Sequence, residues 1–268
     1  MAKIKRIHLL AAGAWIVFCA LFSGGRLEAK DRFILEDDRV FISGDAGLEE
    51  TGRILQRAYP EVVSDLEHIL GWKLIHKPFV LLIGDREEFE RMVEHEPIAA
   101  FAVPRRHLVV LGLPMVERQQ YLLLETFKHE LCHLLLHDHI PEGLPKWLDE
   151  GVCQWVSGSL GELMIGREGG LAGPVDLARQ AVPLSSLEDA FPGGKQQMAA
   201  AYEQSRSVVD AIVSGYGKMG LLGILDGLER GESIEEAVLG SLGKPLSSVE
   251  SQWRESLSMV RVWMVKLG

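Results

Sequence analysis

The segment LETFKHELCHLLLHDH, residues 124–139, carries four histidines. Two of them, His129 and His133, enclose Glu130 in the order H-E-x-x-H. Four residues turn an α-helix through about 400°, so both imidazoles lie on one face, about 6 Å apart along the axis, and can bind one ion. Glu130 is displaced around the helix, where it can remove a proton from a water that the ion activates. The spacing therefore predicts a catalytic zinc site with Glu130 as the general base.

Two downstream residues are candidates for the third ligand. His139 matches the outer spacing of H-E-x-x-H-x-x-G-x-x-H, but that pattern uses a glycine to break the helix, and Leu136 occupies its position here. Glu150 lies in LPKWLDEG, after a short loop that can reverse the chain. Two histidines and a glutamate leave a fourth zinc position open for water. We predict His129, His133 and Glu150 as the metal ligands, with a site that uses His139 as the alternative.

The residues around the motif predict a buried helix. H-E-x-x-H also occurs by chance, but here leucines and Cys132 make the segment apolar on nearly every side. Burying three ionisable groups there is costly unless something compensates their charge and hydrogen bonding. A metal ion provides that compensation, which favours the zinc interpretation.

The elements that must position these residues change character along the chain. Residues 33–43, 79–84 and 99–114 read as strands, whereas 47–70 and 85–93 read as helices. From Glu117 onward the pattern is helical; one helix ends at Ile140-Pro141 and the next runs from Pro145 to Gly158. Two capping boxes, Ser233…Glu236 and Ser247…Glu250, announce later helices. We predict an α+β fold in which a small mixed N-terminal sheet with helices, residues 30–116, packs against a mainly helical part, residues 117–268, so that 30–268 form one catalytic domain.

The N-terminal segment has the composition of a signal peptide. Basic residues come first, an apolar run from Ile7 to Phe22 follows, and small and polar residues lead to Ala29. The run is short for a membrane span. We predict a signal peptide over residues 1–29 and a periplasmic or extracellular protein without stable membrane insertion; an uncleaved segment that tethers the protein to the membrane is the alternative. After cleavage Cys132 and Cys153 remain, and we expect free buried thiols rather than a disulfide.

The charge of the chain limits its partners. The formal net charge is −10, and no basic stripe is present. Electrostatic binding to nucleic acid or to anionic lipid is therefore not expected. A peptide or protein substrate fits the predicted site, and the sequence has no pattern that indicates an oligomeric state.

At the metal-binding residues the chain resembles the gluzincin zinc peptidases, the superfamily of thermolysin and aminopeptidase N. HELCH is followed, seventeen residues after His133, by Glu150 in WLDEG; the aminopeptidase N branch has W-L-N-E-G, and Asp149 replaces the asparagine. More specifically, the chain is similar to small exported bacterial peptidase MA-like proteins. That resemblance implies a zincin-type fold in which an α/β part precedes the zinc helices, a tyrosine-bearing helix and a small helical C-terminal part.

The resemblance also implies a role for a tyrosine. In the aminopeptidase branch a tyrosine on a following helix stabilises the oxyanion; Tyr202 has the similar place, without the family's lysine and glycine, and Tyr216 is the competitor. The amine-recognition motif G-x-M-E-N is absent, which favours an endopeptidase over an aminopeptidase. The strand HLVVL, residues 107–111, is expected to line the cleft and pair with an extended substrate. An exported zinc-binding domain without peptidase activity is the alternative function.

Overall fold

A mixed five-stranded sheet forms one side of the computed structural model, which describes residues 31–93, 98–113, 120–158, 177 and 179–267. The chain divides into two units, 1–31 and 32–268, and the strands and helices that the structure describes belong to the second. The strands are β1 (Arg32–Glu36), β2 (Phe41–Asp45), β3 (Phe79–Ile83), β4 (Ala100–Val103) and β5 (Leu108–Gly112). Their order is β1-β2-β3-β5-β4, in which β2, β3 and β5 are parallel and the two edge strands are antiparallel to their neighbours. The mixed sheet is as the sequence predicted.

The position of β5 corrects one expectation about the substrate strand. The HLVVL segment forms β5, which is hydrogen-bonded to β3 on one side and to β4 on the other. Its backbone groups are therefore already paired, and it has no free edge for another strand. On this side of the described sheet the edge strand is β4, whose sequence is AFAV.

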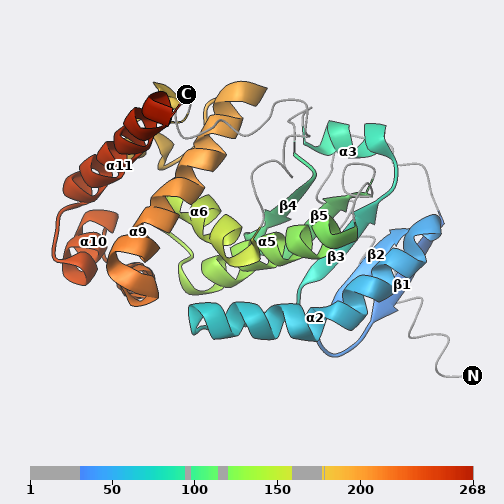
Figure 1. Cartoon of the computed structure of the whole chain (residues 1–268). Helices are drawn as coiled ribbons and strands as arrows, with labels where there is room; N and C mark the ends of the chain where they lie inside the picture. Colours follow the sequence, from blue (N-terminus) through green and yellow to red (C-terminus); the bar gives the residue numbers. More distant parts are fainter. Residues whose placement is uncertain (1–30, 94–97, 114–119, 159–176, 178, 268) are drawn as a thin grey trace, which may run out of the picture. The chain divides into compact units, whose positions relative to one another are not determined.

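The helices of the first half pack on this sheet (Figure 1). After the short 3-10 turn η1 (Ala46–Leu48), α2 (Glu49–Leu70) contacts β1, β2 and the metal-motif helix. Its inward face carries Leu55, Tyr59, Leu66 and Leu70, at helical spacing. The helix α3 (Arg86–Met92) begins after Asp85, whose carboxylate accepts a hydrogen bond of 3.0 Å from the backbone N–H of Glu88.

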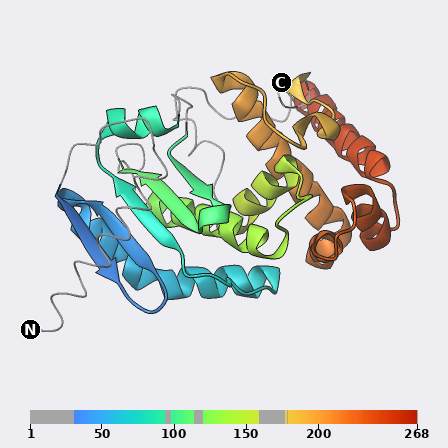
Figure 2. The same ribbon diagram turned by 180° about the vertical axis from the view of Figure 1, so that it is seen from behind.

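The second half is helical, as predicted. Its elements are α5 (Gln120–His139), α6 (Lys146–Ser157), the 3-10 turn η4 (Leu184–Leu187), α9 (Lys195–Glu229), α10 (Ile234–Leu242) and α11 (Leu246–Leu267). A left-handed Gly217, with φ of 73°, bends α9 into two helical segments. Figure 2 shows α6 lying between α5 and α9. The fold is therefore α+β, and most of the residues that the structure describes are helical.

Gly151 of α6 faces α9 and permits a close contact between these two helices. A Cβ on it would lie 2.5 Å from the carbonyl oxygen of Ser205 and 2.7 Å from a methyl group of Val209. Only a residue without a side chain permits α6 and α9 to pack at this distance.

One of the two predicted capping boxes is present. Ser233 accepts from the backbone N–H of Glu236, whose carboxylate accepts in return from the backbone N–H of Ser233. The second prediction is wrong, because α11 begins at Leu246 and Ser247 already lies inside its first turn. Glu250 pairs with Arg254, one turn further along the helix, at 2.8 Å.

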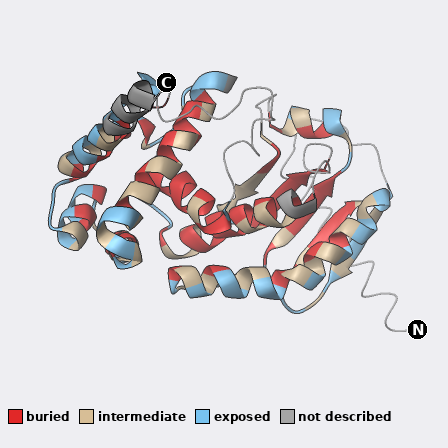
Figure 3. Cartoon of the chain, in the orientation of Figure 1, coloured by how far each residue is buried: buried red, intermediate tan, exposed pale blue. Residues whose placement is uncertain are grey.

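One hydrophobic core connects the sheet to the helices. Buried side chains run from Ile42 and Val80 in the strands through Leu135 on α5 to Ile224 on α9 and Trp253 on α11. Figure 3 shows this buried material concentrated along α5 and in the strands. The metal-motif helix thus lies at the centre of the core, where its side chains are held firmly.

Among the described residues, one segment, Gln196–Glu229, is long and apolar enough to cross a membrane by length and composition. It belongs to the bent α9, which contacts α6 and α10 and buries Val208, Val209 and Ile212 in the core. Core helices pass the same test, so this is weak evidence for a span. The predicted signal peptide lies outside the described residues.

Candidate metal centre

Two antiparallel helices bring the residues of the motif together. The buried side chains of Phe127 and Leu136 lie on opposite sides of α5, so the helix is enclosed by the core. Pro145 precedes α6 in extended conformation, which suits a helix start, and Trp147 and Leu148 are fully buried. These apolar anchors fix the first turns of α6 beside the histidines of α5.

His129, His133 and Glu150 converge on one point. Nε2 of His129 lies 3.1 Å from Nε2 of His133, and Oε2 of Glu150 lies 3.4 Å and 3.5 Å from these two nitrogens. Donors that share a tetrahedral ion at 2.0–2.1 Å are separated by about 3.3 Å. All three side chains are buried. The donor set and its spacing therefore fit one zinc-like ion.

Asp149 orients one of these histidines. Its Oδ1 lies 2.7 Å from Nδ1 of His133, and its Oδ2 lies 3.2 Å from Nε2 of His137. A proton on Nδ1 of His133 leaves the Nε2 lone pair directed at the convergence point. Burial alone would raise the pKa of Asp149, but His133 outweighs it and holds the pKa of this carboxyl well below its usual range. In turn, Asp149 and Glu150 overcome the effect of burial and raise the pKa of His133.

Lys146 holds the other oxygen of Glu150. Its Nζ lies 2.8 Å from Oε1 of Glu150, one helical turn away, so Oε2 remains directed at the histidines. Burial opposes the charged forms of both groups, yet each stabilises the other. The pKa of Lys146 is therefore raised and that of Glu150 is well below its usual range. The lowered pKa favours the carboxylate form of Glu150, which is the form that binds a metal.

Glu130 is the buried acid next to the ligands. It is 1% exposed, and its Oε1 accepts no hydrogen bond from the described residues. Burial raises the pKa of this carboxyl, although His129 and His133 oppose the shift. A proton acceptor near neutral pH requires a raised carboxyl pKa of this kind.

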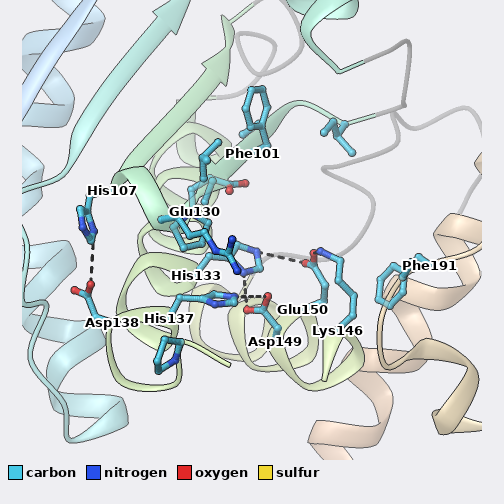
Figure 4. Close-up of a pocket in the computed structure, with 18 of the residues that line it drawn as sticks. Phe101, His107, Glu130, His133, His137, Asp138, Lys146, Asp149, Glu150 and Phe191 are labelled. Atoms are coloured by element: carbon cyan, nitrogen blue, oxygen red, sulfur yellow. Dashed lines mark hydrogen bonds and ion pairs between the residues drawn. The ribbon is translucent and has the colours of Figure 1, made fainter. Parts of the chain in front are cut away.

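Glu130, His133 and Glu150 line a cleft of about 1220 Å³ (Figure 4). The strand β4, from Ala100 to Val103, also lines this cleft, as do Phe191 and Tyr202. The cleft thus combines a buried acid, metal donors and a strand whose outer edge is unpaired within the described sheet.

The two tyrosines have different surroundings. Tyr202 is 6% exposed, lines the cleft, and packs edge-on against Phe191 with ring centroids 5.0 Å apart. Tyr216 is not among the residues that line the cleft, and its hydroxyl donates to Gln252 at 3.1 Å. The geometry therefore favours Tyr202 for a role in the cleft.

His139 lies apart from the converging donors. Its Nδ1 lies 2.8 Å from a carboxylate oxygen of Glu229, and its Nε2 lies 2.9 Å from the carbonyl oxygen of Lys73. The ring stacks on Trp72 at 4.7 Å. Both nitrogens are thus engaged elsewhere, and the geometry gives the alternative site with His139 no support.

Both remaining cysteines are buried free thiols, as expected from sequence. Cys153 lies on α6, and its Sγ is 3.4 Å from Nδ1 of His133. Burial raises the pKa of Cys153. The neutral thiol therefore acts as packing behind the histidine.

Several contributors were missed by sequence reasoning. Asp149 was interpreted only as a substitution in the W-L-N-E-G pattern, and Lys146 was not considered. Their positions, immediately before Glu150 and one helical turn before it, were the available signal. A second group, His76, His107 and Asp138, gathers at another part of the cleft and has no local signal, because its members come from three separate segments.

Comparisons with known proteins place this geometry in context. The model of the Peptidase MA superfamily matches residues 101–259, which include the converging donors and Glu130. Aminopeptidase A of Legionella pneumophila, crystallised in complex with aspartic acid, has a similar fold, with a TM-score of 0.50 and 14% identity. The match covers 84% of this chain but 28% of that one, so the chain spans less than a third of its structural neighbour. A search of curated proteins gives no match.

Proposed function

The chain belongs to the Peptidase MA superfamily, and from that premise we propose that it is an exported zinc-dependent peptidase that cleaves within peptide chains. One observation carries the proposal: the nitrogens of His129 and His133 and one oxygen of Glu150 lie 3.1–3.5 Å apart, beside the buried Glu130. A structural site would enclose its ion with four protein ligands, whereas three leave a position open to the cleft.

A zinc ion held by these three residues would supply Lewis acidity toward a peptide carbonyl and would lower the pKa of water. The chain's own residues prepare that chemistry. Asp149 fixes the tautomer of His133, and Lys146 fixes the orientation of Glu150. Both supports act through hydrogen bonds within or between two buried helices, which keeps the donors in place before the ion arrives.

Glu130 is the proposed general base. Its carboxylate lines the cleft and has one oxygen with no hydrogen bond from the described residues. It would take the proton of the attacking water and transfer it to the nitrogen of the departing amine. Tyr202, which also lines the cleft, is proposed to donate a hydrogen bond to the oxygen that becomes negative during attack.

The edge strand β4 is the proposed binding surface for the substrate backbone. It lines the cleft and has one unpaired edge within the described sheet, so an extended peptide can add to it as a further strand. Such binding recognises the backbone along its length and does not depend on a free amine. Together with the absence of a G-x-M-E-N sequence, this favours an endopeptidase. The basic and apolar N-terminal segment supports export.

The Glu130→Gln variant tests the proposal. It removes the base but keeps a side chain of similar size, so we expect peptide-library cleavage to fall at least about 100-fold while bound zinc remains at the wild-type level. The matched control is Glu125→Gln on the same helix, which does not line the cleft and should cleave normally. Normal cleavage by Glu130→Gln, or no cleavage by the zinc-loaded wild type, would refute the assignment.

A further inference from the structure

We propose that His76, His107 and Asp138 form a second binding site for a divalent transition-metal ion, on the rim of the cleft. Their candidate ligand atoms all lie within 4.8 Å of one another. The three residues come from the loop between α2 and β3, from the turn before β5 and from the last turn of α5. They share no residue with the donors on α5 and α6, so the two sites are chemically separate.

The distances suit a shared ion. Oδ1 of Asp138 lies 2.8 Å from Nδ1 of His76 and 3.6 Å from Nδ1 of His107. These values lie on either side of the roughly 3.3 Å that separates donors on a tetrahedral zinc ion. The two imidazole rings lie over each other, with centroids 4.0 Å apart. His76 and His107 are 52% and 33% exposed, so both have room to rotate toward an ion.

Backbone hydrogen bonds hold the carboxylate of Asp138 in place. The Asp138 side chain is only 3% exposed. Its Oδ2 accepts hydrogen bonds from the backbone N–H groups of Ile75, at 2.9 Å, and His76, at 3.4 Å. These bonds direct Oδ1 toward the two rings (Figure 4 draws the contact with His107). Ligating carboxylates are usually supported by such outer hydrogen bonds.

The backbone of His107 supports a functional rather than an incidental arrangement. Its φ of 49° makes it the one non-glycine residue with a positive φ among the residues that the structure describes. A side chain in this region costs about 1–2 kcal/mol, and glycine or asparagine would lower that cost. Strained residues of this kind collect at functional sites. This backbone conformation places the imidazole of His107 beside Asp138, whose hydrogen bonds to Ile75 and His76 do not require a second histidine.

The donor set indicates the kind of ion. Two imidazoles and one carboxylate suit zinc, cobalt or nickel better than calcium or magnesium, which prefer oxygen ligands only. The site on the helices has the same donor types but is buried, whereas this one faces solvent. We therefore infer the weaker affinity for the rim site. Its ion would face the same cleft and would also join the loop before β3 to the end of α5.

Zinc titration of the purified full-length chain tests the inference. Equilibrium dialysis with elemental analysis should give about two ions per wild-type chain, one tight and one weak. The variants His76→Ala and His107→Asn should each bind about one ion; asparagine tolerates the left-handed backbone, so the second variant is expected to fold. His68→Ala, an exposed histidine on α2 outside both clusters, is the matched control and should bind two ions.

The same titration separates this site from the proposed catalytic one. Glu150→Ala should lose the tight ion and keep the weak one, whereas His76→Ala should lose only the weak one. A wild-type chain that binds a single ion, or an unchanged number of ions in His76→Ala and His107→Asn, would overturn the second site. Neither result would affect the peptidase proposal, which depends on the tight ion and on Glu130.

Discussion

Two groups of histidines and a carboxylate share the cleft, and they are built in opposite ways. The helix group, His129, His133 and Glu150, takes its donors from two buried helices at fixed spacing. The rim group, His76, His107 and Asp138, takes them from a loop, a turn and a helix end, with two of the three partly exposed. Rigid elements can hold donors at distances suited to an ion without the ion, whereas loops depend more on the ion itself.

The two groups also differ in the hydrogen-bonding partners that support their donors. In the helix group, Asp149 supports His133 and Lys146 supports Glu150, and both partners lie on α6. In the rim group, Asp138 has comparable support from two backbone N–H groups, and the described residues give the two histidines no such partner outside the group. We therefore expect substitutions of ligands and of their supporting partners to have larger effects in the helix group.

The largest effect is expected for Glu150→Ala. It removes one of three donors and leaves Lys146 beside an open position, so tight zinc binding and peptide cleavage should both fall to background. His139→Ala is the contrasting variant, since that imidazole binds Glu229 and Lys73 instead. It should keep wild-type zinc content by elemental analysis. Loss of zinc in His139→Ala with retention in Glu150→Ala would instead identify a site completed by His139.

The contrast also shows why sequence predicted one group and not the other. The spacing of four between His129 and His133 is a helical period. The WLDEG segment contains Glu150 and follows a loop short enough to return the next helix beside the first. Apolar periodicity and caps are local signals as well. They predicted the strands, the helices of residues 47–70 and 85–93 and the helix start at Pro145. The α+β class followed from their order.

What sequence could not predict depends on contacts between distant segments. His76, His107 and Asp138 are separated by about 30 residues each, and nothing local announces their meeting. The order of the strands is equally non-local, so the edge position of β4 was assigned instead to the strand after it. The close contact of Gly151 with α9 is non-local as well, and the motif around Glu150 does not identify α9 as the partner.

An intermediate effect is expected for Asp149→Asn. The amide keeps the shape of the carboxylate but loses the charge that holds His133 in its ligating tautomer. Zinc affinity of the helix group should fall by about 10–100-fold, as measured by competition with a chelator, while the rim group is unchanged. Asp189→Asn, an exposed residue that also lines the cleft, is the control and should bind zinc normally. An unchanged affinity in Asp149→Asn would mean that the two helices alone hold His133 in place.

The smallest effect on zinc binding is expected for Gly151→Ala, which acts only through packing. The added methyl group would meet the carbonyl oxygen of Ser205 at 2.5 Å, a backbone atom that moves only with α9. Overpacking of this kind should lower the free energy of unfolding by about 1–3 kcal/mol in urea denaturation. The control is Gly240→Ala, at an exposed helical position where an added Cβ would meet no neighbouring atom within 4 Å. It should be neutral or stabilising by up to about 1 kcal/mol.

Because α6 carries Glu150, a shift of that helix in Gly151→Ala should also weaken zinc binding by the helix group and leave the rim group unaffected. Equal weakening at both groups would show that the rim depends on the same helix packing, and the distinction between rigid and loop-built sites would then fail.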